Sequence, residues 1–400
     1  MTDFRLRDIA VAAYGPTVVS SIGYGAVTPM IALRARDLGA SVGMAAFIVA
    51  LFGLGMMMTS LPAGAVVARL GERRTLMAAG VVDAVAMVAA ALASSVVTFG
   101  IAIVVSGAAW TAFLISRQGF MIDAVPVAYR ARAMSTLGGT FRTGVFLGPL
   151  LGAALIHSFG LTSVFLLSGA CSLVAGLLGF AMPDLGVENR AQQRVDGFAS
   201  VRSVVWEHRR TLMTLGLAVV VIGASRSVRN GLMPLWADHI GISASTTSLV
   251  FAVSALVDIV MFYPGGWVMD RHGRSIVAVP IVLGVAVACL VLPLVSTAAG
   301  LAAVMVAISL ANGLGSGIVM TMGADTAPVA GRLQYVGAWR LCGDIGVSGG
   351  PLLVSVLSLV APLGAVAVVV GLVGLAGSAW VAYWTRDLDR TLQSEVVSRS

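Results

Sequence analysis

The stretch DAVPVAYR at residues 123–130 returns later in the chain as DTAPVAGR at 325–332, so that 202 residues separate Asp123 from Asp325. The same offset relates two further blocks of glycine, proline and arginine. They are Pro62, Gly64, Arg69 and Gly71 with Pro264, Gly266, Arg271 and Gly273, and Gly144, Gly148 and Pro149 with Gly346, Gly350 and Pro351. One offset for all three blocks indicates a chain built from two homologous halves in parallel order.

The composition places both halves in a membrane. The 400 residues are 58% hydrophobic and 11% charged, and the mean hydropathy of +0.97 is far above that of soluble proteins. A spanning helix needs about 20 mostly apolar residues, whereas a membrane β-barrel would show short alternating segments. The sequence predicts twelve helical spans, at about 9–33, 42–68, 75–95, 97–122, 133–157, 160–182, 211–236, 244–269, 275–296, 299–324, 333–358 and 361–384.

The predicted fold is therefore all-α, with six spans in each half. We expect one bundle at 1–182, a polar linker at 183–210 and a second bundle at 211–400. The linker is interpreted as a solvated connection, and a regulatory or partner-binding role is the alternative. Two parallel, apolar halves are typical of transporters that alternate about a central site.

Arginine supplies all 25 basic residues, and most of them fall in alternate loops. Arginine-rich loops face the cytoplasm, so both termini are predicted to be cytoplasmic and the first span is interpreted as retained rather than as a cleaved signal. This arrangement also explains the net charge of +7 without a nucleic-acid partner, because no arginine stripe is interleaved with exposed aromatic residues.

Other classes of site find little support. Cys171, Cys289 and Cys342 fall inside predicted spans without metal-ligand spacing, which favours buried thiols over a metal site or a disulfide framework. No Ser-His-Asp set or nucleotide motif stands in a plausible place. We expect neither an enzyme nor a cofactor.

The loop GAVVARLGERR at 64–74 resembles the signature of the major facilitator superfamily, Gly-x-x-x-Asp-Arg-x-Gly-Arg-Arg, and GWVMDRHGR at 266–274 resembles it more closely. Ala68 departs from the pattern at the acidic position, which Asp270 keeps. The resemblance extends over the whole chain and implies two six-helix bundles that alternate access. It marks as gating residues Gly64, Arg69, Gly71, Asp123, Asp270, Arg271, Gly273 and Asp325.

In that family, Arg69 and Arg271 would lie beside Asp123 and Asp325 and brace the cytoplasmic side. The resemblance also implies that Asp270 caps the start of span five, where the helix dipole stabilises a carboxylate. The alternative is that these loop charges only set the topology.

Span five carries GVFLGPLLG at 144–152, which resembles the Gly-x-x-x-Gly-Pro-x-x-Gly pattern of drug and proton antiporters in the superfamily. The residues are Gly144, Gly148, Pro149 and Gly152, and they imply export. Close helix packing through small residues is the alternative origin of the pattern.

Ionisable residues inside a membrane are costly and normally face a bundle interior. Eight fall in the predicted spans: Asp83, Arg117, Arg142, Arg226, Arg229, Asp258, Arg340 and Asp344. The repeat and the span packing of the superfamily set Arg142 against Asp258, and Arg340 precedes Asp344 by one helical turn. Burial favours the protonated carboxyl and arginine favours the carboxylate, so Asp258 and then Asp344 are the candidate proton carriers. A structural ion pair is the alternative for each.

Arg226 falls past mid-membrane and Arg229 is expected to snorkel to the outer surface. Arg117 resembles weakly the arginine of another antiporter motif, and Asp83 is interpreted as its neutralising partner. Adaptable apolar walls of a substrate cavity can come from Tyr24, Trp110, Phe113 and Met56, which can equally be packing residues.

The sequence therefore predicts a monomeric secondary transporter of the cytoplasmic membrane that exchanges protons for amphipathic small molecules. The five arginines and three aspartates in the spans leave a surplus of positive charge. Guanidinium groups bind carboxylates well, so a carrier of small organic anions that uses Arg142, Arg226 and Arg340, with Arg117 in the same cavity, is the alternative.

Overall fold

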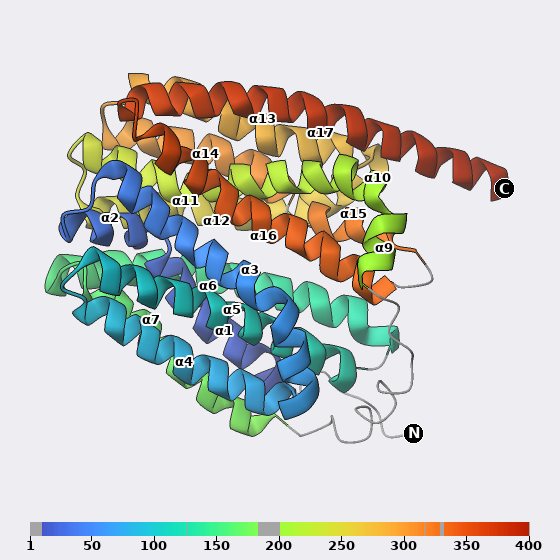
Figure 1. Cartoon of the computed structure of the whole chain (residues 1–400), viewed down its shortest axis with the longest axis horizontal. Coiled ribbons are helices and arrows are strands. Elements are labelled where there is room, and N and C mark those ends of the chain that lie inside the picture. Colours follow the sequence, from blue (N-terminus) through green and yellow to red (C-terminus); the bar gives the residue numbers. More distant parts are fainter. Residues whose placement is uncertain (1–9, 126, 183–200, 316, 329–331, 400) are drawn as a thin grey trace. The chain divides into compact units, whose positions relative to one another are not determined.

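The computed structural model describes residues 10–125, 127–182, 201–315, 317–328 and 332–399, and every regular element in these ranges is a helix (Figure 1). Eleven helices are long and apolar enough to cross a membrane, and a twelfth span results if one bent helix pair counts as a single span. The all-α prediction with twelve spans is confirmed in this form.

The first half of the chain contains seven α-helices and one short 3-10 helix. They are α1 (Ala10–Val27), α2 (Met30–Asp37), α3 (Val42–Leu70), α4 (Glu72–Leu92), α5 (Val96–Ala124), α6 (Val127–Phe159), α7 (Ser163–Leu178) and η2 (Gly179–Ala181).

The second half repeats this order after two short helices and a π-helical turn. Its elements are α9 (Val201–Glu207), α10 (Arg209–Thr211), η3 (Leu212–Gly216), α11 (Leu217–His239), α12 (Ala244–His272), α13 (Ser275–Val291), η4 (Leu292–Leu294), α14 (Ala298–Leu314), α15 (Ile318–Thr326), α16 (Arg332–Leu357) and α17 (Leu363–Arg399).

The sequence repeat is also a repeat of helix ends. Ser95 caps α5 by accepting a hydrogen bond from the Thr98 amide, and its repeat equivalent Thr297 caps α14 through the Gly300 amide. Gly71 and Gly273 end the equivalent helices α3 and α12 with φ of 85° and 95°, a conformation that glycine adopts without strain. The repeated glycines and hydroxyl caps therefore set the same helix boundaries in both halves.

The repeat is broken between α14 and α15. Helix α5 is continuous from Val96 to Ala124, whereas its counterpart is divided into α14 and α15. Gly315 caps the end of α14 and Gly317 caps the start of α15. Glycine on both sides of the division weakens the helix there, because glycine is a poor helix former.

The first predicted span is not one straight helix. Helices α1 and α2 are bent by 45° at the break between Val27 and Met30. Pro29 precedes α2 directly, and proline lacks the amide hydrogen that a continuous helix would need. The prediction of a single span at 9–33 is corrected to a bent pair.

The chain divides into two compact units, and each takes a short piece from the other half of the sequence. Unit 1 contains Met1–Ala40, Leu51–Gly197 and Ala244–Ala252, while unit 2 contains Ser41–Ala50, Phe198–Ser243 and Val253–Ser400. The start of α12 thus belongs to unit 1 and the start of α3 to unit 2. Most of the predicted linker, residues 183–200, lies outside the described residues.

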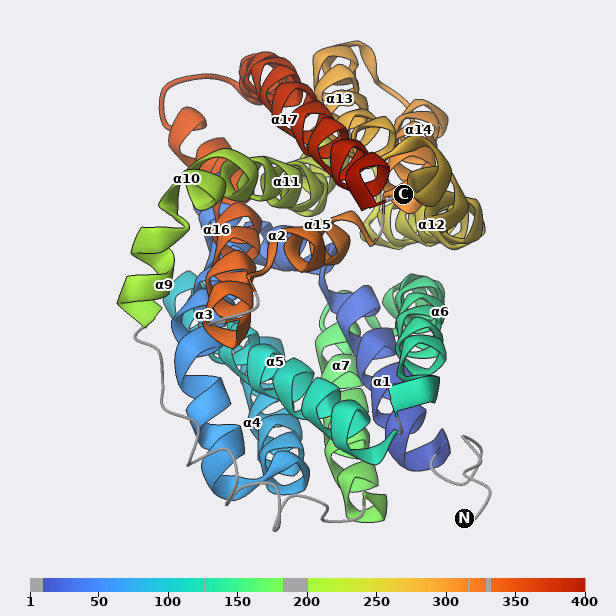
Figure 2. The same cartoon turned by 90° about the vertical axis from the view of Figure 1, so that its right-hand side faces the viewer.

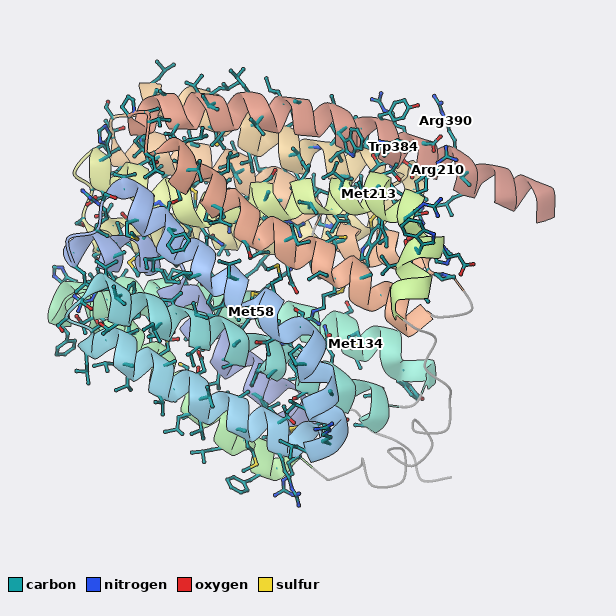
Figure 3. The ribbon with its side chains drawn as sticks, in the orientation of Figure 1. Met58, Met134, Arg210, Met213, Trp384 and Arg390 are labelled. Carbon is teal, nitrogen blue, oxygen red and sulfur yellow. The ribbon has the colours of Figure 1, made fainter. Side chains whose placement is uncertain are left out.

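Equivalent helix pairs form the inside of each unit. In unit 1, α1 packs on α6 and α4 packs on α5 and α7; in unit 2, α11 packs on α16 and α13 on α17 (Figure 2). The outer faces are apolar as well. Met58 and Met213, which are 69% and 71% exposed, are two examples (Figure 3). Apolar outer faces are expected of helices that are surrounded by lipid.

Candidate functional site

A buried ion pair lies at the centre of a polar cluster in unit 2. Arg229 on α11 donates to the Asp258 carboxylate on α12 at 3.1 Å. The two side chains are only 15% and 11% exposed. The same guanidinium nitrogen lies 3.2 Å from the Ser309 hydroxyl of α14. Side chains from α11, α12 and α14 therefore meet at this ion pair.

Asn312 joins this ion pair to a second arginine. Its amide nitrogen donates to the other Asp258 oxygen at 3.1 Å, and its amide oxygen accepts from Arg226 Nε at 2.8 Å. One amide group thus bonds both neighbours, so two hydrogen bonds in series connect Asp258 to Arg226.

The break between α14 and α15 takes part in the same cluster. Arg226 also donates through NH2 to the Gly315 carbonyl at 2.8 Å. Gly315 ends α14, and the last carbonyls of a helix have no partner inside the helix. The guanidinium therefore caps the broken helix, a contact that no charge pattern in the sequence indicates.

One prediction about this cluster is corrected. Arg229 does not snorkel to a surface, because its guanidinium is held by Asp258 and Ser309. This partner of Asp258 was not foreseen, since Arg229 has the apolar repeat equivalent Val27. The expected approach of Arg142 to Asp258, which belong to different units, stays a prediction.

Asp344 and Arg340 form a second polar place in unit 2. Both residues belong to α16, one helical turn apart, so their side chains lie on the same face of the helix. Asp344 is 6% exposed, which is comparable to the 7% of Asp258. The expected pairing of Arg340 with Asp344 stays a prediction.

Unit 1 contains an aromatic cluster. Tyr24 on α1 stacks on Trp110 of α5 with ring centroids 4.6 Å apart, and Trp110 stacks on Phe113 at 6.0 Å. Phe52 and Phe141 join Tyr24 at 5.9 Å and 6.1 Å. Of the predicted wall residues, Tyr24, Trp110 and Phe113 are thus brought together, and Phe52 and Phe141 are added to them.

The aromatic cluster and the polar cluster occupy equivalent positions of the repeat. The offset that relates the halves pairs Tyr24 with Arg226, Phe52 with Ser254, Met56 with Asp258, Trp110 with Asn312 and Phe113 with Gly315. One set of backbone positions therefore presents stacked rings in unit 1 and charged, hydrogen-bonding groups in unit 2.

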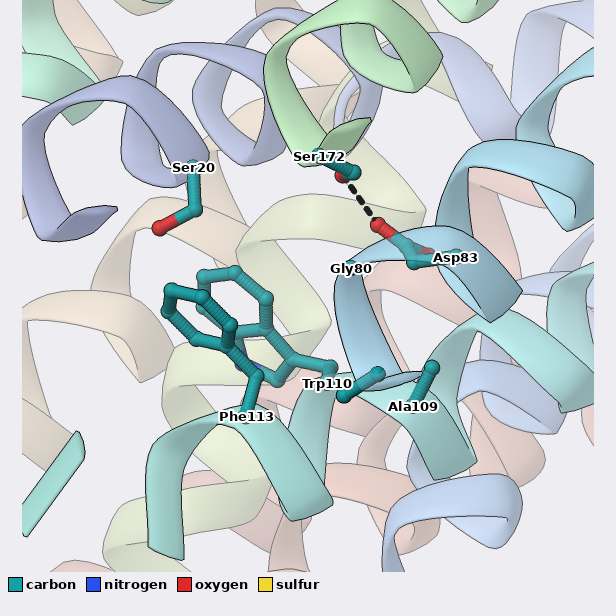
Figure 4. Close-up of a pocket in the computed structure, with 8 residues that line it drawn as sticks. Ser20, Gly80, Asp83, Ala109, Trp110, Phe113 and Ser172 are labelled. Atoms are coloured by element: carbon teal, nitrogen blue, oxygen red, sulfur yellow. Dashed lines mark hydrogen bonds between the residues drawn. The ribbon is translucent and has the colours of Figure 1, made fainter. Parts of the chain in front are cut away.

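Asp83 and Arg117 in unit 1 do not neutralise one another as predicted. The Asp83 carboxylate accepts hydrogen bonds from Ser106 and Ser172. Arg117, which is 8% exposed, approaches the Thr17 hydroxyl at 3.5 Å. Asp83 also borders a small pocket with Trp110 and several small residues (Figure 4).

The family-like loop of unit 2 is held by a different arginine than expected. Arg274, and not Arg271, forms the ion pair with Asp325 at 2.9 Å. Arg271 lies instead over the Trp267 ring at 5.4 Å. Asp389 of α17 accepts from the amides of Arg274 and Ser275, which caps the start of α13.

Several other side chains of the two loops are not described. Ala68 and Asp123 of unit 1 and Asp270 of unit 2 are among them, so the predicted contacts of the two acids stay predictions. Gly64 and Arg69 are exposed at the end of α3.

The antiporter-like glycines on α6 give close helix contacts. A side chain at Gly144 would meet Ser21 and Val18 of α1, and one at Gly148 would meet Ile22 and Ala26. The repeat equivalents Gly346 and Gly350 approach α11 in the same way, and a side chain at Gly152 would meet Ser248 of α12 at 3.2 Å. Packing accounts for the glycines in both halves.

The Pro149 carbonyl has a further contact, and the repeat equivalent of its partner cannot make the same contact with Pro351. Its carbonyl accepts from the Ser248 hydroxyl at 2.8 Å, and Ser245 bonds the Ala153 carbonyl one turn later at 2.9 Å. The repeat equivalent of Ser248 is Ala46, which has no hydroxyl. The motif of span five thus ties the start of α12 into unit 1.

Sequence reasoning missed Asn312, Ser254 and Ser309 and dismissed Arg229. Ser254 and Ser309 share a hydrogen bond of 2.5 Å beside the ion pair. These positions had a usable signal: Ser254 precedes Asp258 by one helical turn and Ser309 precedes Asn312 by three residues, so each pair faces one side of its helix.

Comparisons with known proteins give the same family from sequence and from structure. The sequence profile of the Major Facilitator Superfamily matches residues 17–217 and 215–398. The chain is 20% identical over 250 residues to Multidrug resistance protein 2 of Bacillus subtilis (strain 168), an alignment that covers 61% of this chain and 62% of that protein. The chain thus matches less than two thirds of that relative's length.

Solved transporters share the fold. A crystal structure of the peptide transporter POT in complex with sulfate superimposes with a TM-score of 0.77 at 13% identity, covering 96% of this chain and 95% of the other. A POT family transporter in complex with a thioalcohol-conjugated peptide gives 0.79 at 11% identity, covering 96% of both chains. With profile matches along both halves, the chain belongs to the major facilitator superfamily, and its long apolar helices make it a multi-pass membrane protein.

Proposed function

We propose that this transporter exports amphipathic small molecules in exchange for protons by alternating access. The observation that carries the proposal is the division between the two units: the same repeat positions hold stacked aromatic rings in unit 1 and the Asp258 ion pair in unit 2. The similarity to a protein named for multidrug resistance supports export.

The aromatic cluster supports an amphipathic substrate. Stacked rings of Tyr24, Trp110 and Phe113 offer flat apolar faces, and each aromatic contact contributes about 0.5–1.5 kcal/mol beyond its buried area. Aromatic faces also attract cations. Such a wall accepts varied flat or cationic molecules without the fixed hydrogen bonds that a single polar substrate needs.

The Asp258 cluster supports proton coupling. A carboxylate with 7% exposure in a spanning helix is costly unless it is paired or protonated. Arg229 and Asn312 stabilise the ionised form at present. A conformational change that separates Arg229 from Asp258 favours proton uptake, and its reversal releases the proton. Asp344 is the second candidate carrier, because Arg340 on the same helix acts on it in the same sense.

The proposal extends to location and gating. Arginines gather at one end of unit 2, where Arg210 and Arg390 are seen near Trp384 (Figure 3). We assign this end to the cytoplasm of the cell, with both termini there and the protein in the cytoplasmic membrane. The Arg274 pair with Asp325 and the Asp389 cap then brace the cytoplasmic loop between α12 and α13.

A second candidate, a carrier of small organic anions, is favoured by one observation. The unit 2 cluster contains two guanidinium groups, Arg226 and Arg229, and one carboxylate, Asp258. An excess of guanidinium suits a carboxylate ligand, which arginine binds through two hydrogen bonds. In this reading Arg142 and Arg340 add further positive charge.

Transport in proteoliposomes with an imposed pH gradient separates the candidates. Ethidium serves as the cationic aromatic probe and benzoate as the anionic probe. Export coupling predicts that a proton gradient drives ethidium accumulation, and that Asp258→Asn reduces this accumulation to the level of empty vesicles. Asp344→Asn, which removes a comparably buried carboxylate at the second candidate carrier, is measured beside it.

Benzoate accumulation that Arg226→Ala abolishes, with no gradient-driven movement of ethidium, would replace the first candidate by the second. Full gradient-driven accumulation of ethidium in Asp258→Asn, together with its loss in Asp344→Asn, would identify Asp344 as the proton carrier.

A further inference from the structure

A third acid within the spans, the partly buried Asp83, stands apart from the groups in the proposed function. It lies about halfway along α4, whose span runs from Glu72 to Leu92. Its carboxylate is held by two hydroxyl groups from two different helices, Ser106 of α5 and Ser172 of α7, each at 2.5 Å (the Ser172 bond is drawn in Figure 4). Asp83 therefore occupies the junction of three helices of unit 1.

Close packing fixes the geometry of this junction. Gly80, one turn before Asp83, lies so near α7 that a side chain there would meet the Gly176 backbone at 2.6 Å and the Ser172 carbonyl at 2.7 Å. The two helices cannot separate from Asp83 without losing this contact. The carboxyl group thus stays in a fixed, hydroxyl-lined position within the membrane span.

The surroundings of Asp83 differ from those of Asp258 in their charge. Asp258 has Arg229 at 3.1 Å, whereas the contacts of Asp83 among the described side chains are the two neutral serines. The helices that pack on α4 are α5 and α7. Their titratable groups are Arg117, whose guanidinium approaches Thr17, and the Cys171 thiol; α1, which reaches the pocket through Ser20, adds Tyr14 and Tyr24. The Asp123 side chain on α5 lies outside the described residues.

A pocket gives Asp83 a connection to the aromatic cluster. Asp83, Ser20 and Ser172 line it together with the rings of Trp110 and Phe113 (Figure 4). Trp110 also stacks on Tyr24 with centroids 4.6 Å apart. The Trp110 ring therefore lines the pocket and also belongs to the aromatic cluster. The pocket has room for water rather than for a drug-sized molecule, because two rings, two serines, an acid and three small residues line it closely.

We propose that Asp83 is a proton-binding site of unit 1, in which the carboxyl group carries a proton shared with Ser106 and Ser172 and exchanges it through the pocket beside Trp110. A lone carboxylate in a spanning helix is costly, and a proton removes its charge where no cation does so. A protonated carboxyl can donate to one serine and accept from the other, so both hydroxyl contacts are kept. The inference does not depend on what the chain transports.

Infrared difference spectroscopy of the full-length protein in lipid nanodiscs tests this inference. A protonated carboxylic acid has a carbonyl band that an ionised carboxylate lacks. We expect this band at neutral pH in the wild type, its loss in Asp83→Asn, and its retention in the matched variant Asp258→Asn. An unchanged band in Asp83→Asn, or no band in the wild type, would mean that Asp83 is ionised and would overturn the inference.

Variants of the hydroxyl partners and of the pocket give a second test in which Asp83 itself is unchanged. Ser106→Ala and Ser172→Ala should each shift the band to higher frequency, because a carbonyl with fewer hydrogen bonds is stiffer. Trp110→Ala should speed the deuterium shift of the band after transfer to heavy water, whereas the more distant Phe52→Ala should not. If both serine variants leave the band frequency unchanged and Trp110→Ala leaves the deuterium exchange unchanged, the shared proton and the proposed route are both contradicted.

Discussion

The two units place opposite chemistry on equivalent positions of one repeat. In unit 1, Tyr24 stacks on Trp110. In unit 2, their counterparts Arg226 and Asn312 form a hydrogen bond of 2.8 Å. The backbone pattern is shared, since α3 and α12 end at equivalent glycines and α5 and α14 begin at equivalent caps. A duplicated scaffold has therefore kept its helix ends and diverged in the side chains at the site.

Equivalent positions of the repeated scaffold therefore do not carry equivalent functional groups. Asp258 has the counterpart Met56, and Arg229 has the counterpart Val27. Unit 1 in turn has an acid, Asp83, whose counterpart in unit 2 is Val285. Each unit thus has a buried acid of its own, with a cation in unit 2 and with two hydroxyls in unit 1.

The largest effect is expected from the unit 2 ion pair. Asp258→Asn leaves Arg229 buried without its carboxylate, and removal of one partner of a buried pair costs about 3–5 kcal/mol. The double variant Asp258→Asn with Arg229→Gln should recover most of that stability, yet it should still fail to couple protons. Thermal unfolding and gradient-driven ethidium transport measure the two effects separately. Restored coupling in the double variant would show that the pair is structural.

The next effect belongs to the aromatic cluster of unit 1. Trp110→Ala removes the ring that stacks on both Tyr24 and Phe113. We expect the KM for ethidium to rise about tenfold, which corresponds to about 1.4 kcal/mol. Trp110→Phe keeps a ring and is the matched control. Initial transport rates over a range of ethidium concentrations measure KM. A normal KM with a changed number of protons exchanged per ethidium would reverse the roles assigned to the units.

A smaller effect is expected at the bridging amide. Asn312→Ala removes the hydrogen bonds to both Asp258 and Arg226, and a buried group that loses its partner costs about 1–3 kcal/mol. The unfolding temperature should fall, and the pH at which transport is half-maximal should change. Asn312→Gln, which keeps the amide, is the control. An unchanged pH profile in Asn312→Ala would show that Asn312 does not act on Asp258.

The smallest effect is expected at the loop between α12 and α13. The Arg274 pair with Asp325 is 23% and 20% exposed, and pairs that solvent reaches contribute about 0–1 kcal/mol. Arg274→Ala should lower the unfolding temperature slightly, more at low salt than at high salt. Arg271→Ala removes a neighbouring charge that does not reach Asp325 and should have the weaker salt dependence. Equal behaviour of the two variants would dismiss the ion pair as a brace.

Much of the fold could be predicted because it depends on hydrophobic length and on repetition. Spans such as 244–269 follow from apolar runs that end at glycine, and α12 runs from Ala244 to His272. The bend between α1 and α2 and the break before α15 were missed, since a local Pro29 or Gly315 interrupts a helix without shortening the apolar run.

The polar cluster of unit 2 was predicted less well because its members were sought by their charge. Asp258 and Asp344 were found as charged residues in apolar spans, but Asn312 and Ser309 are neutral and look like ordinary span residues. The contact of Arg229 with Asp258 was missed because the inference used repeat symmetry and the span packing of the family, while Arg229 has no polar counterpart in unit 1. Only the packing of α11 against the other helices of unit 2 brings the two charges together.

The division of roles between the units can be measured by counting the protons released when ethidium binds to the purified transporter in weakly buffered solution. We predict release of protons by the wild type, binding without release by Asp258→Asn, and weaker binding with undiminished release at saturation by Trp110→Ala. Full proton release by Asp258→Asn, or its loss in Trp110→Ala at saturating ethidium, would contradict the division of roles between the two units.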